Sequence, residues 1–251
     1  MAGHSKWAQI KHKKKATDAK RGQLFSKLSR AIIVAAREGG PDPAGNLALQ
    51  NAIEKARSYS MPKDNIERAI AKGAGAGDEG SGFETVVYEG YGPDGVAVLV
   101  EALTDNRNRT ASEVRHLFSK HGGNLGTTGA VAWQFERRGV VVVPAEGVDE
   151  DELVLVAADA GADDVERDGS SYAVTSAPEL LAAVRGALEE AGFPVDSAEL
   201  AMVPKSTVAV TDESSARRIM RLVEELEDAE DVQGVYANFD IPESVLEAVA
   251  S

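Results

Sequence analysis

The chain contains no cysteine, so it can form no disulfide and can use no thiolate as a nucleophile or metal ligand. It also lacks a long hydrophobic run. The longest runs, near Ala31–Ala36 and Val140–Ala145, are far shorter than the roughly 18 residues that a membrane-spanning helix requires. The basic N-terminus is not followed by the apolar segment of a secretory signal. We therefore expect a cytoplasmic protein with no membrane partner.

Motifs of the common enzyme classes are missing too. There is no Walker A run, no H-E-x-x-H and no G-x-S-x-G. Two G-x-G-x-x-G matches, Gly75–Gly80 and Gly90–Gly95, do not connect a strand to a helix, as a dinucleotide site requires. His116 and His121 have no further histidine or cysteine near them in the sequence with which to build a metal site. We expect that the protein is not an enzyme and has no cofactor.

The charges that are present are distributed very unevenly. Residues 1–73 contain 15 Lys or Arg against 6 Asp or Glu, whereas residues 74–251 contain 12 against 35. The net charges of +9 and -23 add up to the total of -14. Affinity for phosphate follows local cationic density rather than the charge of the whole chain, so the N-terminal part is suited to a polyanion.

Residues 18–73 predict three short helices. The first begins near Asp18, buries an apolar stripe that includes Leu24 and Leu28, and ends at Gly39-Gly40. The second runs over about 44–59, and the third begins at Pro62, because proline suits the first turn of a helix. A Gly-rich linker follows at 73–82, where the sign of the charge changes.

Beyond the linker, strands alternate with helices. Among them are expected strands over 130–136 and near 207–211, and a helix that Ser176–Glu179 would open as a capping box. Residues 139–204 alone predict the ferredoxin-like order of strand, helix, strand, strand, helix, strand. The flanking pieces each predict strand–helix–strand, and they would complete a second such unit if they pair across the insertion. The expected fold is therefore α+β and multidomain, with an N-terminal three-helix domain and two ferredoxin-like domains, one inserted in the other. The expected domains are 1–78, then 79–138 with 205–251, and the acidic insertion 139–204.

The N-terminal segment is the leading candidate for a binding site. Cations neutralise phosphates and release counterions, and an indole can stack on an unpaired base. The positive charge continues onto one side of the first helix through Lys20, Lys27 and Arg30, which suits a nucleic-acid footprint better than a solvated tail does. Within residues 4–21, the basic side chains and the indole are His4, Lys6, Trp7, Lys11, His12, Lys13, Lys14, Lys15, Lys20 and Arg21.

Asp105–Thr110 is a second candidate, because it lies between a predicted strand and a helix that Thr110–Glu113 would open as a capping box. Arg107, Arg109 and the following Arg115 could hold an anion there. The alternative is that these arginines pair with nearby acids. Acid clusters such as Glu224–Asp231 are typical of solvated helix faces.

The long motifs of the chain resemble those of the YebC/PmpR family, which includes the mitochondrial translational activator of cytochrome c oxidase. The similar segments are MAGHSKWAQIKHKKKATDAKRGQLFSKLSRAI at the start, SMPKDNIERAIAKGAG at 60–75 and TDNRNRTASEVRHLFSKHGGNLGTTGAVAWQF at 104–135. The resemblance implies a three-domain cytoplasmic protein. It also implies that His4, Ser5, Lys6, Trp7 and the lysines up to Lys15 contact nucleic acid.

The resemblance implies a DNA-binding transcriptional regulator, or alternatively a ribosome-associated translation factor that relieves stalling at proline-rich stretches. A lysine-rich arm gives positioning contacts with little base readout, which is a difficulty for the first role. The same arm with its Trp suits irregular RNA, which favours the second. The two roles are not exclusive. The expected partner is duplex DNA, ribosomal RNA or tRNA, and the oligomeric state is open.

Overall fold

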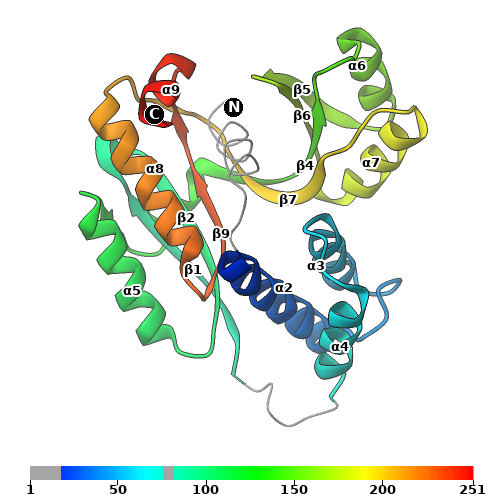
Figure 1. Ribbon diagram of the computed structural model, residues 1–251, viewed down its shortest axis with the longest axis horizontal. Helices are drawn as coiled ribbons and strands as arrows, with labels where there is room; N and C mark the ends of the chain where they lie inside the picture. Colours follow the sequence, from blue (N-terminus) through cyan, green and yellow to red (C-terminus); the bar gives the residue numbers. More distant parts are fainter. Residues whose placement is uncertain (1–17, 76–81, 251) are drawn as a thin grey trace. The chain divides into compact units, whose positions relative to one another are not determined.

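The computed structural model describes residues 18–75 and 82–250, which fall into two compact units. One unit comprises residues 135–205, and the other comprises residues 18–75, 82–134 and 206–250. Figure 1 shows a helical region followed by sheets and further helices, and two of the sheets have four strands each. This confirms the expected α+β class with an N-terminal helical part. The exact division at residues 78, 138 and 204 stays a prediction.

The helical region consists of α2 (Asp18–Gly39), α3 (Leu47–Ser58) and α4 (Lys63–Gly73), in agreement with the three predicted helices. Their core contains Leu28 and Ile32 of α2, Leu49 of α3 and Ile66 of α4. Buried Asn46 connects two of the helices: its Oδ1 caps α3 at the amide of Leu49, while its Nδ2 donates to the carbonyls of Ala35 and Gly40. The end of α2 is thereby fixed against the start of α3.

The sheet of the larger unit has the order β3-β1-β2-β9, and all its neighbouring strands are antiparallel. Its strands are β1 (Glu84–Tyr91), β2 (Ala97–Thr104), β3 (Asn124–Leu125) and β9 (Val232–Ala237). The strands that flank the insertion in the sequence therefore do pair, as β2 and β9. Helices α5 (Arg107–Lys120) and α8 (Glu213–Asp228) pack on this sheet through buried residues such as Phe118 and Leu222.

The remaining elements of the larger unit are short. A 3-10 turn at Pro93–Gly95 joins β1 to β2, and another lies at Ala132–Gln134. The expected strand near 207–211 is the two-residue β8 (Val208–Ala209), which pairs with β10 (Phe239–Asp240) outside the main sheet. Strand β1 lies between β2 and β3. It occupies the place beside β2 that the 207–211 strand would take in a ferredoxin-like sheet. Helix α9 (Glu243–Ala250) ends the described chain.

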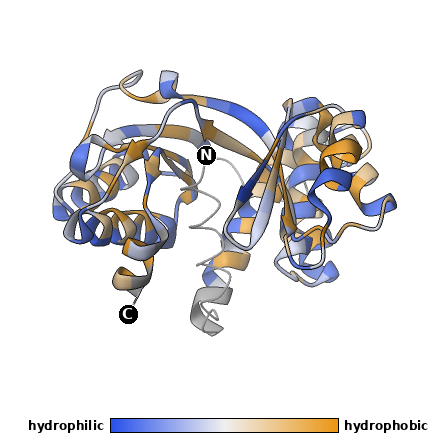
Figure 2. Ribbon diagram, turned by 90° about the horizontal axis from the view of Figure 1, so that it is seen from above, coloured by the Kyte–Doolittle hydropathy of each residue, from blue (hydrophilic) through white to orange (hydrophobic). Residues whose placement is uncertain are grey.

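The inserted unit has the predicted ferredoxin-like topology. Its sheet has the order β5-β6-β4-β7, formed by β4 (Phe135–Pro144), β5 (Ala162–Asp168), β6 (Ser171–Ser176) and β7 (Ser197–Pro204). Helices α6 (Glu150–Asp159) and α7 (Leu181–Glu190) contribute Leu153, Val184 and Leu188 to its core, and a 3-10 turn at Pro178–Leu180 precedes α7. In Figure 2 the helices alternate between hydrophilic and hydrophobic residues, as helices with one buried side do.

Three local predictions were wrong. Thr110–Glu113 does not open a helix, because Asn106 caps α5 through the amide of Arg109, and Thr110 lies inside that helix. Ser176 is the last residue of β6 and donates to the carbonyl of Ala177 instead of capping α7. The expected strand over 130–136 is mostly a loop, because the amides of Val131 and Ala132 donate to Glu89 and are not available to a neighbouring strand.

Candidate nucleic-acid interface

Most of the predicted binding residues precede the described part of the chain. His4, Ser5, Lys6, Trp7, Lys11, His12, Lys13, Lys14 and Lys15 lie outside the described residues. Lys20 and Arg21 belong to the first turns of α2, and Lys27 and Arg30 follow on the same helix. The binding role of the N-terminal segment therefore stays a prediction, while the last two cations can be placed in their surroundings.

Lys27 contacts the last turn of α8, and Arg30 contacts the acidic turn between α8 and β9. Lys27 Nζ donates to the backbone carbonyl of Glu227. Arg30 spans two acids, with Nη2 at 2.9 Å from Glu230 Oε1 and Nη1 at 3.2 Å from Asp231 Oδ1. Its guanidinium also lies 4.9 Å from the centre of the Phe83 ring, a cation–π contact. Only 14% of the Arg30 side chain is exposed, so its charge is largely used within the protein.

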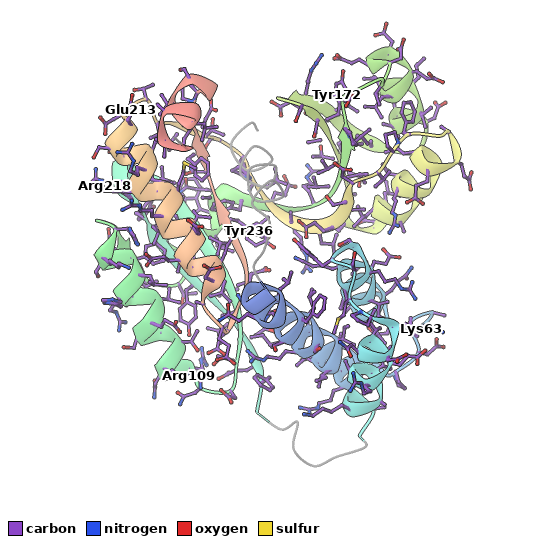
Figure 3. All side chains as sticks on the ribbon, viewed as in Figure 1. Lys63, Arg109, Tyr172, Glu213, Arg218 and Tyr236 are labelled. Atoms are coloured by element: carbon purple, nitrogen blue, oxygen red, sulfur yellow. The ribbon has the colours of Figure 1, made fainter. Side chains whose placement is uncertain are left out.

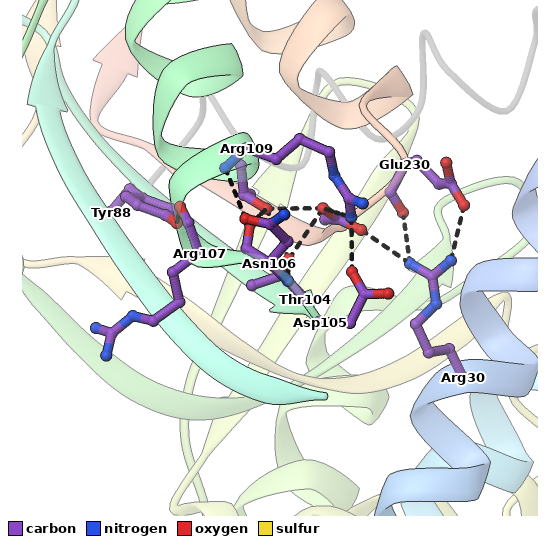
Figure 4. Close-up of polar contacts among 10 residues, drawn as sticks. Arg30, Tyr88, Thr104, Asp105, Asn106, Arg107, Arg109 and Glu230 are labelled. Carbon is purple, nitrogen blue, oxygen red and sulfur yellow. Dashed lines mark hydrogen bonds and ion pairs between the residues drawn. The ribbon is translucent and has the colours of Figure 1, made fainter. Parts of the chain in front are cut away.

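Asp231 is the centre of a polar network that joins four segments. Figure 4 labels three of its partners, Arg30, Thr104 and Arg109. Its side chain is only 3% exposed. Arg109 Nη2 and Thr110 Oγ1 each lie 2.7 Å from Asp231 Oδ2, and Thr104 Oγ1 lies 3.1 Å from the same oxygen. A buried carboxylate requires such donors, since an unpaired buried charge is costly. The network ties the end of β2 and the start of α5 to the turn before β9, and Arg30 adds α2.

The donors around Asp231 also determine its protonation. Burial raises the pKa of the Asp231 carboxyl, but hydrogen bonds from Arg109, Thr110 and Thr104 outweigh burial and hold the pKa below its usual value. The carboxylate is therefore charged at neutral pH and can balance the two arginines that approach it. This charge balance gives the Asp105–Thr110 motif a clear structural role.

The three arginines of the second candidate site differ in their surroundings. Arg109 also pairs with Asp105 at 2.9 Å, so its guanidinium is held by two acids. Arg107 is exposed and lies 3.6 Å from Glu84, while its backbone carbonyl accepts a hydrogen bond from Tyr88. Arg115 is exposed and forms no ion pair with any described residue. The three side chains therefore do not form one anion-binding cluster, and their role as anion contacts stays a prediction.

Sequence reasoning missed Asp231 because it treated the acidic run 224–231 as a solvated helix face. The helix ends at Asp228, and Asp231 lies in the turn before β9, where the chain enters the sheet. Its three hydroxyl and guanidinium partners are more than 120 residues away in the sequence. No local sequence pattern reveals partners at such a distance. The position of Asp231 in a turn that leads into an apolar strand was, however, a usable signal that its side chain is buried.

A second buried carboxylate organises the loop before β4. Glu89 is 4% exposed and accepts hydrogen bonds of 2.7 Å from the amides of Gly129, Val131 and Ala132. Burial raises the pKa of Glu89, but these three amides outweigh it and lower the pKa below its usual value. The loop presents Trp133, whose side chain is 68% exposed although its indole N–H donates to the carbonyl of Ala130. The loop thus holds an aromatic ring at the surface.

Residues 18–75 and 82–250 contain no group of three or more His, Asp or Glu side chains that could hold a metal ion. In the same ranges no helix is both long and apolar enough to span a bilayer.

Comparisons with known proteins cover nearly the whole chain. Residues 5–76 match a family model described as the TACO1/YebC protein N-terminal domain, and residues 83–239 match one described as the TACO1/YebC second and third domain. A curated relative from Rubrobacter xylanophilus is 59% identical over 250 residues, covering 100% of both chains. One from Aquifex aeolicus is 54% identical, covering 99% of this chain and 100% of its own length. Both are named probable transcriptional regulatory protein.

A solved structure is similar as well. The crystal structure of a conserved hypothetical protein from Aquifex aeolicus has 54% sequence identity and a TM-score of 0.84. The similarity covers 94% of this chain and 97% of that chain. Sequence and fold therefore agree over both units.

Proposed function

Because this chain belongs to the TACO1/YebC family, we propose that it is a nucleic-acid-binding regulator of gene expression that acts on transcription through duplex DNA. The printed names of its relatives support a regulatory role. We place this role in the cytoplasm, without a catalytic step. The basic segment that contains Lys11, Lys13, Lys14 and Lys15 would be the primary contact.

The observation that carries the proposal is the separation of charge along the chain. Residues 1–73 have a net charge of +9, and the remainder has -23. A polyanion is attracted to the first part and repelled by most of the second, so the chain would bind in one orientation. The packing of α2 against α3 and α4 supports this, because a basic segment joined to a folded helix is presented from a fixed base.

A ribosome-associated role in translation is the second candidate. The feature that favours it is Trp7 among the cations, since an indole stacks on unpaired bases, which are common in folded RNA. Duplex DNA offers few such bases. The two candidates therefore predict different partners for the same basic segment.

The test is a competition between the two partners. Purified protein is offered ribosomes and an excess of promoter-bearing duplex DNA at about 150 mM salt, which suppresses weak phosphate binding. One variant changes Lys11, Lys13, Lys14 and Lys15 to Gln. The matched control changes Arg57, Lys63, Arg68 and Lys72 to Gln, which removes the same charge from exposed positions of the helical region.

We expect the wild-type protein to be retained on DNA in a sequence-dependent manner. The variant of the basic segment should lose this retention, and the control variant should keep it. Retention on ribosomes instead, lost in the same variant, would overturn the DNA role and support translation. Equal losses in both variants would show that total charge, and not the basic segment, determines binding.

A further inference from the structure

Lysine and arginine are confined to one place in the larger α+β part of the chain. Residues 82–134 and 206–251 contain seven of them against seventeen Asp or Glu. All seven lie on two helices, α5 and the first nine residues of α8. Those two segments carry only two acids, Glu113 and Glu213. The seven cations are Arg107, Arg109, Arg115, Lys120, Arg217, Arg218 and Arg221.

The two helices lie side by side and run in opposite directions. At one end Arg109 of α5 binds Asp231, which follows α8. Further along, Lys120 Nζ lies 2.7 Å from Glu225 Oε2. At the other end Arg218 Nη1 lies beside Gly122, 3.4 Å from the position that a Cβ would occupy there. Figure 3 labels Arg109 and Arg218 near the opposite ends of this helix pair.

Some of these cations are neutralised within the protein and others are not. Arg109 is held by Asp105 and Asp231, and Lys120 by Glu225. By contrast, four arginines are exposed and form no ion pair with any residue in the described ranges; Arg218 only donates to Ser215 Oγ at 3.2 Å. We call these four, Arg115, Arg217, Arg218 and Arg221, the α5–α8 arginine surface.

The stability of α8 does not explain where its arginines lie. The N-terminal end of a helix dipole is positive, so cations are favoured at the C-terminus and acids at the N-terminus. In α8 the order is reversed, with Arg217, Arg218 and Arg221 among the first nine residues and Glu224, Glu225, Glu227 and Asp228 among the last five. Near the C-terminal end, Glu225 pairs with Lys120 and the backbone carbonyl of Glu227 accepts a hydrogen bond from Lys27. The three arginines form no ion pair with any residue in the described ranges, so they are available to a partner of opposite charge.

We propose that the α5–α8 arginine surface binds the phosphodiester backbone of the nucleic acid, as a second contact separate from the basic N-terminal segment. Arginine is suited to this ligand because its planar guanidinium can donate two parallel hydrogen bonds to one phosphate. Arg217 and Arg221 are about 6 Å apart along the helix axis, so the two can contact different phosphates. The contact carries no base readout, so it adds affinity and orientation. It rests on the proposed function, since a nucleic acid must be the partner.

The test measures how the affinity for nucleic acid depends on salt. The probes are a duplex DNA of about 30 base pairs and an RNA hairpin of similar charge, because both share the backbone. The variant is Arg217→Gln, Arg218→Gln and Arg221→Gln together. The control, Arg137→Gln, Arg167→Gln and Lys205→Gln, removes the same three charges from exposed positions of the inserted unit. Thermal unfolding of each variant confirms that it folds.

For a duplex, each lost phosphate contact lowers the slope of log K against log salt by about 0.9. We expect the α8 variant to lose about two to three units of slope while the control keeps the wild-type slope. Loss with one probe only would identify that nucleic acid as the ligand. An α8 variant with the wild-type slope, or a control that loses as much, would overturn the inference. If the wild-type protein binds neither probe, the proposed function itself fails.

Discussion

The carboxylate of Asp231 lies 2.7 Å from Nη2 of Arg109, a residue that precedes it by 122 positions. The inserted unit, residues 135–205, lies between them in the sequence. The two halves of the split sheet are thus joined by an ion pair between exposed Arg109 and buried Asp231 as well as by the pairing of β2 with β9. This pair gives the Asp105–Thr110 motif a role that does not require a ligand.

The substitution Asp231→Asn should destabilise the larger unit by about 3 kcal/mol. It removes the charge that Arg109 and Arg30 share, and it places an amide opposite two hydroxyl donors. Urea unfolding at pH 7 measures the change in the free energy of unfolding. Glu230→Gln is the control, because that side chain is 76% exposed and an exposed pair contributes less than about 1 kcal/mol. Equal effects of the two substitutions would contradict the central role of Asp231.

The same carboxylate should make stability depend on acidity. Its pKa in the folded state lies below the unfolded value of about 3.9, because its donors outweigh burial. The resulting stabilisation is present above the unfolded pKa and is lost as the pH falls through the folded pKa. The difference in unfolding free energy between wild type and Asp231→Asn should therefore be steady from pH 8 to about 5 and shrink below about 4. A difference that is unchanged at pH 3 would be evidence against this assignment.

Arg30→Gln should affect folding more than binding. Arg30 is largely buried against Glu230, Asp231 and Phe83, so its charge is already used. We expect a loss of about 1–3 kcal/mol in unfolding free energy. We also expect a smaller change in the salt dependence of DNA binding than Lys13→Gln causes. Parallel unfolding and filter-binding measurements test both parts. If Arg30→Gln lowers the salt slope by a full phosphate contact, then Arg30 leaves its acidic partners when DNA binds.

Glu89→Gln should loosen the loop that carries Trp133. The carboxylate accepts three backbone amide hydrogens, and a Gln side chain would turn its own donor group toward at least one of them. The expected cost is about 2 kcal/mol. In a Trp7→Phe background Trp133 is the remaining tryptophan, so its fluorescence anisotropy reports on the loop, and it should fall. Glu101→Gln, a half-buried acid on the next strand, serves as the control and should leave the anisotropy unchanged.

The sequence predicted those features that depend on neighbouring residues. Gly39 and Pro62 lie at helix ends where expected, and apolar periodicity located Leu28 in the core of the helical region. Two of the failures involve a partner that is distant in the sequence, namely Asp231 for Thr110 and Glu89 for the loop over 130–136. Thr110 matches a capping box, yet its hydroxyl binds Asp231. The candidate site was predictable only as a charge pattern, because a helical wheel cannot show that Arg30 faces acids 200 residues away.

Gly73→Ala should weaken the packing of α4 on α2. A Cβ at Gly73 would lie 2.5 Å from the carbonyl oxygen of Ile33 and 2.7 Å from the Cβ of Ala36. The first of these is a backbone atom, which cannot move aside without shifting α2, so the expected loss is about 1–3 kcal/mol. Gly22→Ala, also within a helix, meets nothing within 4 Å and should gain about 0.5–1 kcal/mol from reduced freedom of the unfolded chain. Thermal unfolding of both variants compares them directly. Effects of the same sign would mean that the two helices are not in the close contact that Gly73 permits.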